Sequence, residues 1–200
     1  MDVRQAIAAY AQGLFPMDDR DSADGPLPYY VADPRAIFEI DPPGLARVRR
    51  AARRSLARDP GWTLVFDEDF EAVLDGCMAP RPESPGVWIT PRLGGLYRAL
   101  HEGGVAHSFE LRDHEGGLLG GVLAVLLGRA AMLESMYHRV PNAGNVLLVR
   151  TLERLAERGT VLCDVQLATE HTTRLGVVEI PRAEYEQRLA KALRAETSGH

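Results

Sequence analysis

Polar side chains that could bind or activate a substrate interrupt two apolar segments of this chain. Asp164 and Gln166 lie two residues apart at the end of the segment 161–166, and Glu134 lies within the segment 132–137. Residues two apart in a strand project to the same face, so the carboxylate of Asp164 could accept a hydrogen bond from the amide NH2 of Gln166. The amide carbonyl could then receive a proton-bearing amine. The same spacing also fits two strand-end residues that only satisfy backbone groups.

Other polar patterns argue against several classes of enzyme. His107, Ser108 and Glu110 suggest a hydrolase triad, but the chain has no GxSxG turn, and adjacent residues of a strand point to opposite faces. Cys77 and Cys163 are the two cysteines; they form no CxxC pair, and no two histidines are spaced four residues apart. We therefore expect reduced thiols, no structural zinc and no metal site.

A run of positive charge contrasts with the acidic balance of the whole chain. The formal net charge is -5, yet between positions 47 and 58 there is no acid and there are six arginines, namely Arg47, Arg49, Arg50, Arg53, Arg54 and Arg58. A local basic stripe on an acidic protein can dock a polyanion while the rest of the surface repels it. A solvated helix face is the commoner origin of such a run, so the stripe by itself does not establish a polyanion site.

The elements that would position these residues divide near Pro60. Before it, apolar spacing predicts a helix over 3–12 and an extended piece over 36–40, and a basic helix follows Pro42 and Pro43. We therefore expect a small N-terminal domain of residues 1–60 that contains the basic helix. A larger domain of residues 61–200 would hold the polar residues described above.

The larger part reads as helices interleaved with mainly antiparallel strands. Strands are predicted at 62–66, 105–112, 118–127, 130–137, 161–165 and 177–180. Helices are predicted after an Asp67 cap, from Pro91 to Gly103, after an Asn142 cap and over 182–194. This order predicts an α+β class and is compatible with an acetyltransferase-like (GNAT-like) domain, although a fold analogy carries no function on its own.

The chain offers little that would place it in a membrane. Its longest apolar stretch, 118–127, is broken by Gly120 and Gly121 and is too short to span a bilayer. The first residues lack a basic region followed by an apolar run. We expect a cytoplasmic protein.

An ordered series of short motifs resembles a known family. The series is Ala9-Tyr10-x-x-Gly13-x-Phe15-Pro16-Met17, Gly86-Val87-Trp88-Ile89-Thr90-Pro91, Tyr97-x-x-Leu100-His101-x-x-Gly104-x-Ala106-His107-Ser108-x-Glu110, Gly120-Gly121, Glu134-Ser135-Met136-Tyr137, Asn142-Ala143, Asp164-x-Gln166 and His171-Thr172-x-x-Leu175-Gly176. In this order, and over most of the chain, the motifs are similar to those of leucyl/phenylalanyl-tRNA-protein transferases. Each motif is weak alone, whereas an ordered series of this length is hard to produce by chance.

The resemblance implies formation of a peptide bond without the ribosome. The α-amino group of a protein that begins with Arg or Lys would attack the aminoacyl ester of a charged tRNA, and the product would enter the N-end rule degradation pathway. Because that ester is already activated, no cofactor, ATP, metal or acyl-enzyme is implied. The partners implied are therefore aminoacyl-tRNA and the acceptor protein, with no membrane, and we expect a monomer.

The resemblance also implies a role for each matching residue. Gln166 would contact the attacking amine, Asp164 would orient Gln166, and Glu134 would favour the cationic acceptor N-terminus through its charge or position the terminal adenosine. Trp88 would pack near the tRNA 3′ end. The aminoacyl side chain would enter an apolar pocket at Val122, Met136, Leu155 and Cys163, and the tRNA backbone would meet Arg47, Arg49, Arg50, Arg53 and Arg54.

The chain departs from the family pattern at several places. The family has Trp-Trp-Ser-Pro before Asp-Pro-Arg, Phe-Ser-Arg after Glu-Ser-Met, Ala-Ser-Lys after the following Asn or Asp, and a large aromatic residue on the pocket helix. Here these positions hold Tyr29-Tyr30-Val31-Ala32, Tyr137-His138-Arg139, Ala143-Gly144-Asn145 and Thr151. These departures bear on the tRNA contact and on the choice of donor amino acid more than on the reaction class.

Two other functions fit parts of the sequence. A small-molecule N-acyltransferase that uses acyl-CoA would share the fold, but it needs glycines that cradle a pyrophosphate, and the segment 139–144 lacks them at that spacing. A non-catalytic tRNA-binding module would keep the arginines without the chemistry. Intact Asp164, Gln166 and Glu134 argue against this second alternative.

Overall fold

The computed structural model describes residues 2–18, 25–80 and 88–194. Gly86 and Val87, which belong to one of the sequence motifs, lie outside these residues. Within the described ranges the elements are, in order, α1 (Val3–Ala11), β1 (Phe15–Pro16), β2 (Tyr29–Tyr30), β3 (Arg35–Phe38), α2 (Pro42–Leu56), β4 (Thr63–Phe66), α3 (Phe70–Met78), α4 (Pro91–Glu102), β5 (Ala106–Arg112), β6 (Leu118–Leu127), β7 (Ala130–His138), α5 (Ala143–Glu157), β8 (Leu162–Gln166), α6 (Glu170–Arg174), β9 (Val178–Ile180) and α7 (Arg182–Arg194).

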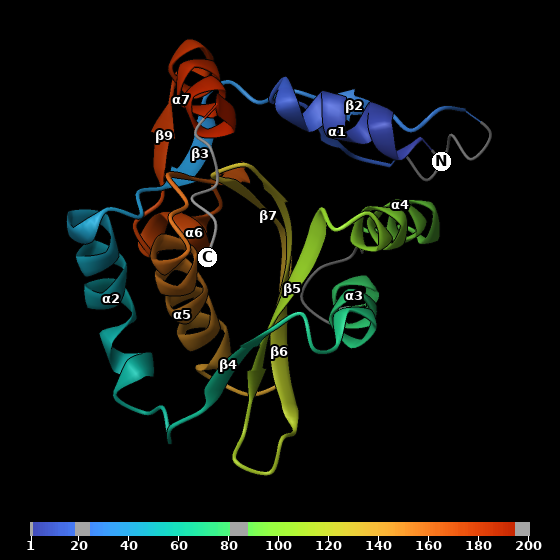
Figure 1. The fold of residues 1–200 in the computed structure, drawn as a ribbon. Helices are drawn as coiled ribbons and strands as arrows, with labels where there is room; N and C mark the ends of the chain where they lie inside the picture. Colours follow the sequence, from blue (N-terminus) through green and yellow to red (C-terminus); the bar gives the residue numbers. More distant parts are fainter. Residues whose placement is uncertain (1, 19–24, 81–87, 195–200) are drawn as a thin grey trace.

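A seven-stranded sheet organises the fold, in the order β4-β5-β6-β7-β8-β3-β9 (Figure 1). Its neighbouring strands are antiparallel, except that β7 and β8 run parallel. β5, β6 and β7 form a meander, and the chain then crosses through α5 to reach β8, because parallel strands cannot be joined by a tight turn. The predicted α+β class with a mainly antiparallel sheet is therefore confirmed.

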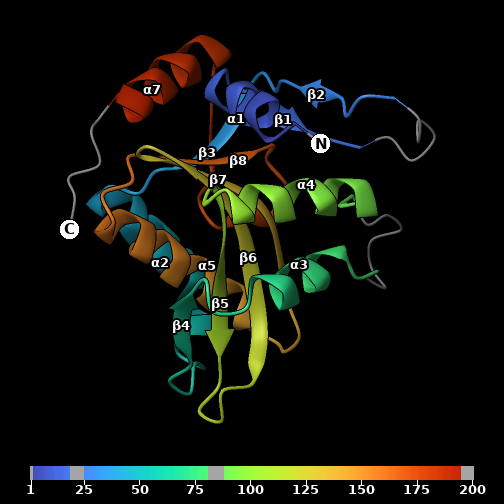
Figure 2. The same ribbon diagram turned by 45° about the vertical axis from the view of Figure 1, so that its right-hand side comes forward.

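Helices cover both faces of the sheet and enclose two apolar clusters (Figures 1 and 2). On one face, α3 and α4 pack through residues such as Val73, Leu74 and Leu96. On the other face, α5 packs through Val146 and Leu152, and α2 lies against α5. The sheet is thus the middle layer of the molecule.

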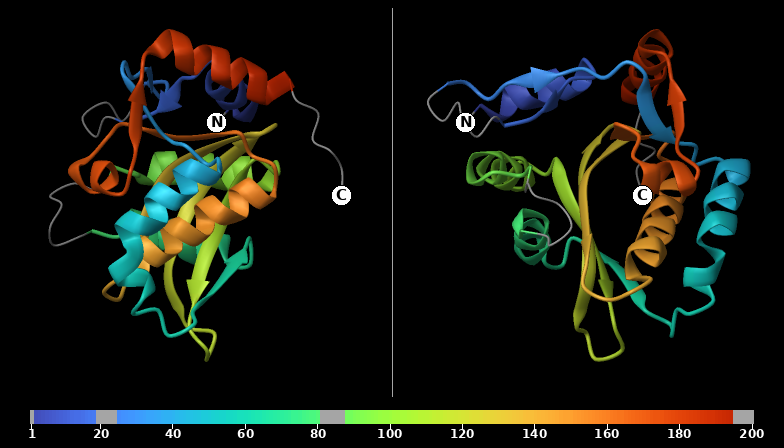
Figure 3. Two further views of the ribbon diagram at one scale, coloured as in Figure 1. Left: turned by 90° about the vertical axis from the view of Figure 1, so that its left-hand side faces the viewer. Right: turned by 180° about the vertical axis from the view of Figure 1, so that it is seen from behind.

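The first sixty residues contribute directly to this sheet. β3 lies between β8 and β9, far from its neighbours in sequence. α1 contacts α4 and α7, and it lies with α7 at the end of the molecule where β3 and β8 are paired (Figure 3). β1 and β2 make a separate two-stranded sheet. The division at residue 60 stays a prediction, but the seven-stranded sheet takes strands from both sides of it.

Two predicted helix caps are wrong in detail. The side chain that caps α3 belongs to Asp69, whose carboxylate accepts from the backbone N–H of Ala72. Asp67 instead adopts a φ of 61° and binds the ring of His107. Asn142 does precede α5, but it has a φ of 69° and makes no capping hydrogen bond, because its side chain accepts from the hydroxyl of Ser55. The α3 cap is thus shifted by two residues, and at α5 a tertiary contact takes the place of the local capping bond.

Candidate functional site

The site lies where the two parallel strands separate. β7 and β8 pair only over three positions, and the last pair is Met132 with Asp164. Beyond that point, β7 has a register shift against β6 that leaves Glu134 as the extra residue, since Leu123 faces Ser135 and Ala124 faces Leu133. A bulge of this kind redirects a side chain and is common beside active sites. Glu134 therefore points into the gap between the strands.

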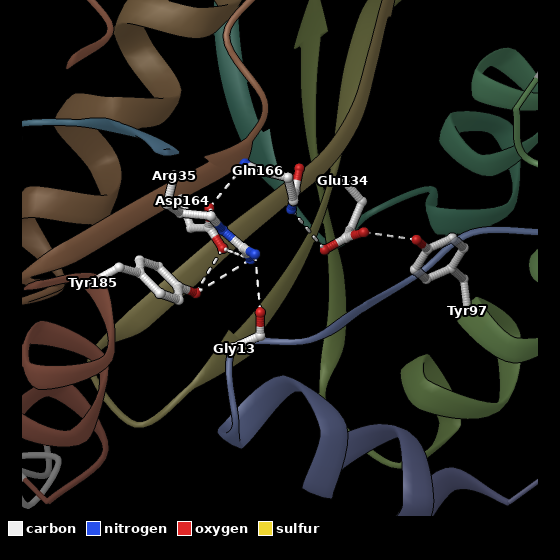
Figure 4. A network of polar contacts seen from close by, with 7 residues as sticks. All are labelled: Gly13, Arg35, Tyr97, Glu134, Asp164, Gln166 and Tyr185. Carbon is white, nitrogen blue, oxygen red and sulfur yellow. Dashed lines mark hydrogen bonds and ion pairs between the residues drawn. The ribbon is translucent and has the colours of Figure 1, made fainter. Parts of the chain in front are cut away.

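Gln166 approaches the same gap from β8. The register of β8 against β3 also shifts, so that Ala36 faces Gln166 and Ile37 faces Asp164, with Val165 as the extra residue. Gln166 has a φ of 59°, in the left-handed region that residues other than glycine rarely adopt. Its side-chain Nε2 donates to Glu134 Oε1 at 3.2 Å (Figure 4). This contact points the NH2 of the Gln166 amide towards Glu134. The carbonyl oxygen of the amide is then the atom that can accept a hydrogen bond from a substrate.

Glu134 is buried and has no cationic partner in direct contact among the described residues. Its side chain Oε2 accepts from the hydroxyl of Tyr97 on α4 at 2.7 Å, and the residue is 5% exposed. Burial raises the pKa of Glu134 to about 8, although the hydrogen bond from Tyr97 acts in the opposite direction. The negative charge of Asp164 raises this pKa further. Near neutral pH the Glu134 carboxyl therefore exists in both protonation states.

Asp164 is fully buried but is held by a cation. Its Oδ1 accepts from Arg35 Nε at 2.8 Å, and its Oδ2 accepts from Arg35 Nη2 at 2.5 Å and from the hydroxyl of Tyr185 at 2.8 Å (Figure 4). The backbone N–H of Gln166 donates to Oδ1 at 2.8 Å. The predicted contact between Asp164 and the amide NH2 of Gln166 is therefore wrong. Glu134 accepts from that NH2, and Asp164 holds the backbone.

A cavity of about 300 Å³ opens beside these groups. Val122 and Met136, which the family resemblance assigned to the apolar pocket, lie in its wall together with Trp88, Glu134 and Gln166. The remaining wall is formed by Phe38, Leu133, Ser135, Leu148, Val165, Leu167, Thr169 and Thr172. Leu155 and Cys163, which the sequence also assigned to the pocket, are 0% exposed and belong to the apolar cluster beneath α5. The structure therefore brings three of the five predicted binding residues to this cavity.

The predicted arginines occupy the outer side of α2. Arg47, Arg49, Arg50, Arg53 and Arg54 are all exposed, whereas Val48 and Ala52 on the same helix are buried. Arg49 forms an ion pair with Glu153 of α5, and Arg53 contacts the backbone carbonyl of Arg50. The stripe is thus a solvent-facing row of positive charge on a helix anchored by its apolar side.

Three residues of the site were missed in the sequence. Arg35, Tyr97 and Tyr185 hold the two carboxylates, and all three are 2% exposed or less. A weak signal for Arg35 existed, since an arginine opens the apolar segment 36–38, and Tyr97 stood in one of the quoted motifs. Nothing in the sequence pattern paired either residue with its carboxylate.

The departures near α5 lie away from the cavity wall. Asn145 donates to Ser55 on α2 at 2.9 Å, and so it ties the start of α5 to the arginine helix. A Cβ added at Gly144 would lie 2.5 Å from Cδ2 of His138, so the two departures occupy one space. Thr151 is fully buried on α5. Among the described residues, no group of three or more His, Cys, Asp or Glu side chains could hold a metal ion, and no helix is long and apolar enough to cross a membrane.

The fold and the site define an α+β domain with a mainly antiparallel sheet, a small apolar cavity and an amide held at the wall of that cavity. A family model described as leucyl/phenylalanyl-tRNA protein transferase matches residues 41–190. This chain belongs to that family.

Relatives with that name match nearly the whole chain. The leucyl/phenylalanyl-tRNA–protein transferase of Rubrobacter xylanophilus is 43% identical over 188 residues, which cover 94% of this chain and 93% of the relative. The protein of the same name from Rhodopseudomonas palustris is 40% identical over 193 residues, covering 96% and 83%. A solved structure described as an acetyl transferase from Pyrococcus furiosus is 20% identical to this chain. The match covers 64% of this chain and 91% of that structure, with a TM-score of 0.39, which is too low to support an inference about function.

Proposed function

We propose that this chain transfers an apolar amino acid, Leu or Phe, from aminoacyl-tRNA to the N-terminal Arg or Lys of acceptor proteins and so marks them for N-end rule degradation. Its membership of the transferase family supports the reaction. The structural observation that carries the proposal is the amide of Gln166, held between two buried carboxylates at the wall of an apolar cavity.

The reaction needs positioning and the movement of one proton. The nitrogen of the acceptor α-amine attacks the ester carbonyl carbon, the new C–N bond forms, and the bond to the ribose oxygen of the terminal adenosine breaks. The attacking species is the neutral amine, so an N-terminus that binds as the ammonium ion first releases one proton. On attack the amine loses one further proton and the leaving ribose oxygen gains one, so no external reagent is required. The Gln166 carbonyl would accept a hydrogen bond from the attacking amine and orient its lone pair towards the ester.

Glu134 lies at the wall where the amine would arrive. With a pKa of about 8, its carboxyl group changes charge near the pH at which an α-amino group does. A cationic N-terminus would favour the carboxylate form, and the carboxylate would favour that N-terminus in return. We therefore assign Glu134 to recognition of the acceptor and to holding the Gln166 amide.

The cavity suits an apolar donor side chain. Val122, Met136 and Leu148 provide apolar walls, and a volume of about 300 Å³ lies at the small end of the usual range for ligand sites. Trp88 would pack against the terminal adenosine. Walls of this kind select by volume, and one methylene is worth only about 1–3 kcal/mol, so Leu and Phe are both expected donors.

The exposed arginines of α2 would bind the tRNA backbone. Their guanidinium groups face solvent on one helix, and phosphate contacts position a nucleic acid without reading its sequence. We further propose that the protein is cytoplasmic, where charged tRNA is made, and that it acts as a monomer.

A transfer assay tests the reaction. The chain is incubated with Leu-tRNA or Phe-tRNA carrying a labelled amino acid and with a model protein that begins with Arg; a matched acceptor begins with Glu. Label in the Arg protein alone is expected, and Gln166→Ala is expected to abolish most of it while tRNA binding is kept. Retention of tRNA without transfer would support a binding module instead. Label that enters only from acyl-CoA would support a small-molecule acyltransferase.

The arginine helix is tested by the salt dependence of tRNA binding. Replacing Arg50, Arg53 and Arg54 together by Gln should weaken binding and lower the slope of log K against log salt by roughly 2 to 3, since each phosphate contact contributes just under one unit. A matched control replaces Arg182, Lys191 and Arg194 of α7, which removes the same charge elsewhere. Equal effects of the two triple variants would rule out a specific contact at α2.

A further inference from the structure

Arg35 is the largest side chain fully buried in the described part of the protein, and it is not in the wall of the cavity. It is 1% exposed and opens β3, the strand beside β8. Its guanidinium donates from Nε and Nη2 to the two oxygens of Asp164, and from Nη1 to the carbonyl of Gly13 at 2.9 Å. The planar guanidinium presents two N–H donors side by side to the Asp164 carboxylate, and these two hydrogen bonds fix the orientation of both groups.

Aromatic rings and a tight loop close over this guanidinium. Its central carbon lies 4.5 Å from the ring centroid of Tyr185 on α7 and 4.9 Å from that of Phe15. Gly13 has a φ of 77°, and a Cβ there would lie 2.8 Å from Cε1 of Tyr185. The loop after α1 therefore packs on the ring that packs on Arg35. Segments far apart in the sequence meet at this one side chain.

A single carboxylate oxygen connects Arg35 to Gln166. Oδ1 of Asp164 accepts from Arg35 Nε and from the backbone N–H of Gln166, each at 2.8 Å. The second contact holds Gln166 in its left-handed backbone conformation. A residue other than glycine keeps a left-handed backbone only where its surroundings enforce it. The position of the Gln166 side chain therefore depends on where Oδ1 of Asp164 lies.

We propose that Arg35 is a positioning residue for the transfer reaction, which acts through Asp164 on the backbone of Gln166 and so sets where the amide stands in the cavity. The inference rests on the proposed function and deepens it. Arg35 touches no substrate in this scheme. Weakening the paired hydrogen bonds between Arg35 and Asp164 should displace the Gln166 carbonyl from the attacking amine and leave the surfaces that bind tRNA unchanged.

Arg35→Lys is the informative variant, because it keeps the buried positive charge and removes the paired N–H donors that fix the Asp164 carboxylate. We expect kcat for transfer to fall about 10- to 100-fold, the loss typical of a misplaced group, with KM for aminoacyl-tRNA changed less than about twofold. Arg188→Lys is the matched control. Arg188 also joins α7 to the β3 side of the molecule, through Glu39 at 2.8 Å, without touching Asp164. It should leave kcat within about twofold.

The double variant Arg35→Lys with Gln166→Ala tests whether the effect passes through Gln166. If it does, adding Arg35→Lys to Gln166→Ala should slow transfer less than about twofold, because the group being positioned is already gone. Should Arg35→Lys not fold, Tyr185→Phe replaces it; this variant removes one donor to Asp164 and should lower kcat in the same way but less.

Each outcome separates this inference from the function on which it rests. A wild-type chain that transfers, together with an Arg35→Lys variant of normal kcat, overturns the inference alone. Equal losses in Arg35→Lys and Arg188→Lys, or fully multiplicative losses in the double variant, overturn it as well, since they indicate general loosening. A wild-type chain that transfers nothing refutes the proposed function, and a Gln166→Ala variant of normal rate refutes the role of Gln166 and that of Arg35 with it.

Discussion

Two buried carboxyl groups flank Gln166, and their surroundings differ. Asp164 is matched by the guanidinium of Arg35 and by the Tyr185 hydroxyl, while Glu134 accepts from the Tyr97 hydroxyl and the Gln166 amide and has no cation in direct contact among the described residues. A buried carboxylate opposite a guanidinium can keep its charge, whereas one without a cation favours its neutral form.

The two carboxyl groups therefore have different roles in holding Gln166. Asp164 is 0% exposed, lies behind the cavity wall and holds the backbone of Gln166, so it fixes the architecture. Glu134 lies in the wall, holds the side chain of Gln166 and titrates near neutral pH. An ion-paired carboxylate behind the wall holds the backbone of Gln166, while a carboxyl group within the wall can change its protonation when a substrate binds.

The two carboxyl groups should differ most in what they contribute to stability. Asp164→Asn leaves the guanidinium of Arg35 buried without its counter-charge, and we expect the free energy of unfolding to fall by about 3–5 kcal/mol. Glu134→Gln replaces a carboxyl group that is largely neutral at pH 7 by an amide of the same shape, and it should cost less than about 2 kcal/mol. Urea unfolding at pH 7 measures both. Equal costs would show that the two carboxyl groups do not differ as described.

Glu134 should also make the stability of the protein depend on pH. The pKa of Glu134 rises from 4.5 to about 8 on folding, so the folded chain keeps a proton that the unfolded chain releases. The stability from this group is complete below pH 4.5 and is lost as the pH rises to about 8, at up to about 1.4 kcal/mol per pH unit.

Urea unfolding of the wild type and of Glu134→Gln at pH 5.5, 6.5 and 7.5 should reveal that slope. The variant has no carboxyl group to titrate, so its stability relative to the wild type should improve steadily over this range. Parallel curves would mean that Glu134 is ionised in the folded chain across the whole interval, and the contrast with Asp164 would disappear.

The sequence predicted the elements better than the contacts at the site. The periodicity of apolar residues located α5, the β5–β7 meander and α7, because each element reports its own burial. The Asp164-x-Gln166 spacing implied a regular strand. The bulge at Val165 and the left-handed backbone of Gln166 changed which atoms meet.

The partners of the two carboxylates could not be predicted for a different reason. Arg35 is 129 residues from Asp164 in the sequence, and Tyr97 is 37 residues from Glu134. Only the insertion of β3 beside β8, and the packing of α4 on the sheet, bring them together. Local patterns carry no information about such pairings, so the two carboxyl groups looked alike until their surroundings were known.

The smallest expected effect comes from removing one phenol hydroxyl at each carboxyl group. Tyr185→Phe leaves Asp164 with both hydrogen bonds from Arg35, so the free energy of unfolding should fall by about 1 kcal/mol, with no change in its pH dependence. Tyr97→Phe removes the hydrogen bond that lowers the pKa of Glu134. The loss of stability with rising pH should then continue to a higher pH than in the wild type. Urea unfolding between pH 6 and 9 compares the two variants, which differ from the wild type by the same atom. A shift in Tyr185→Phe and none in Tyr97→Phe would reverse the assignment, since the titrating group would then be the one beside Arg35.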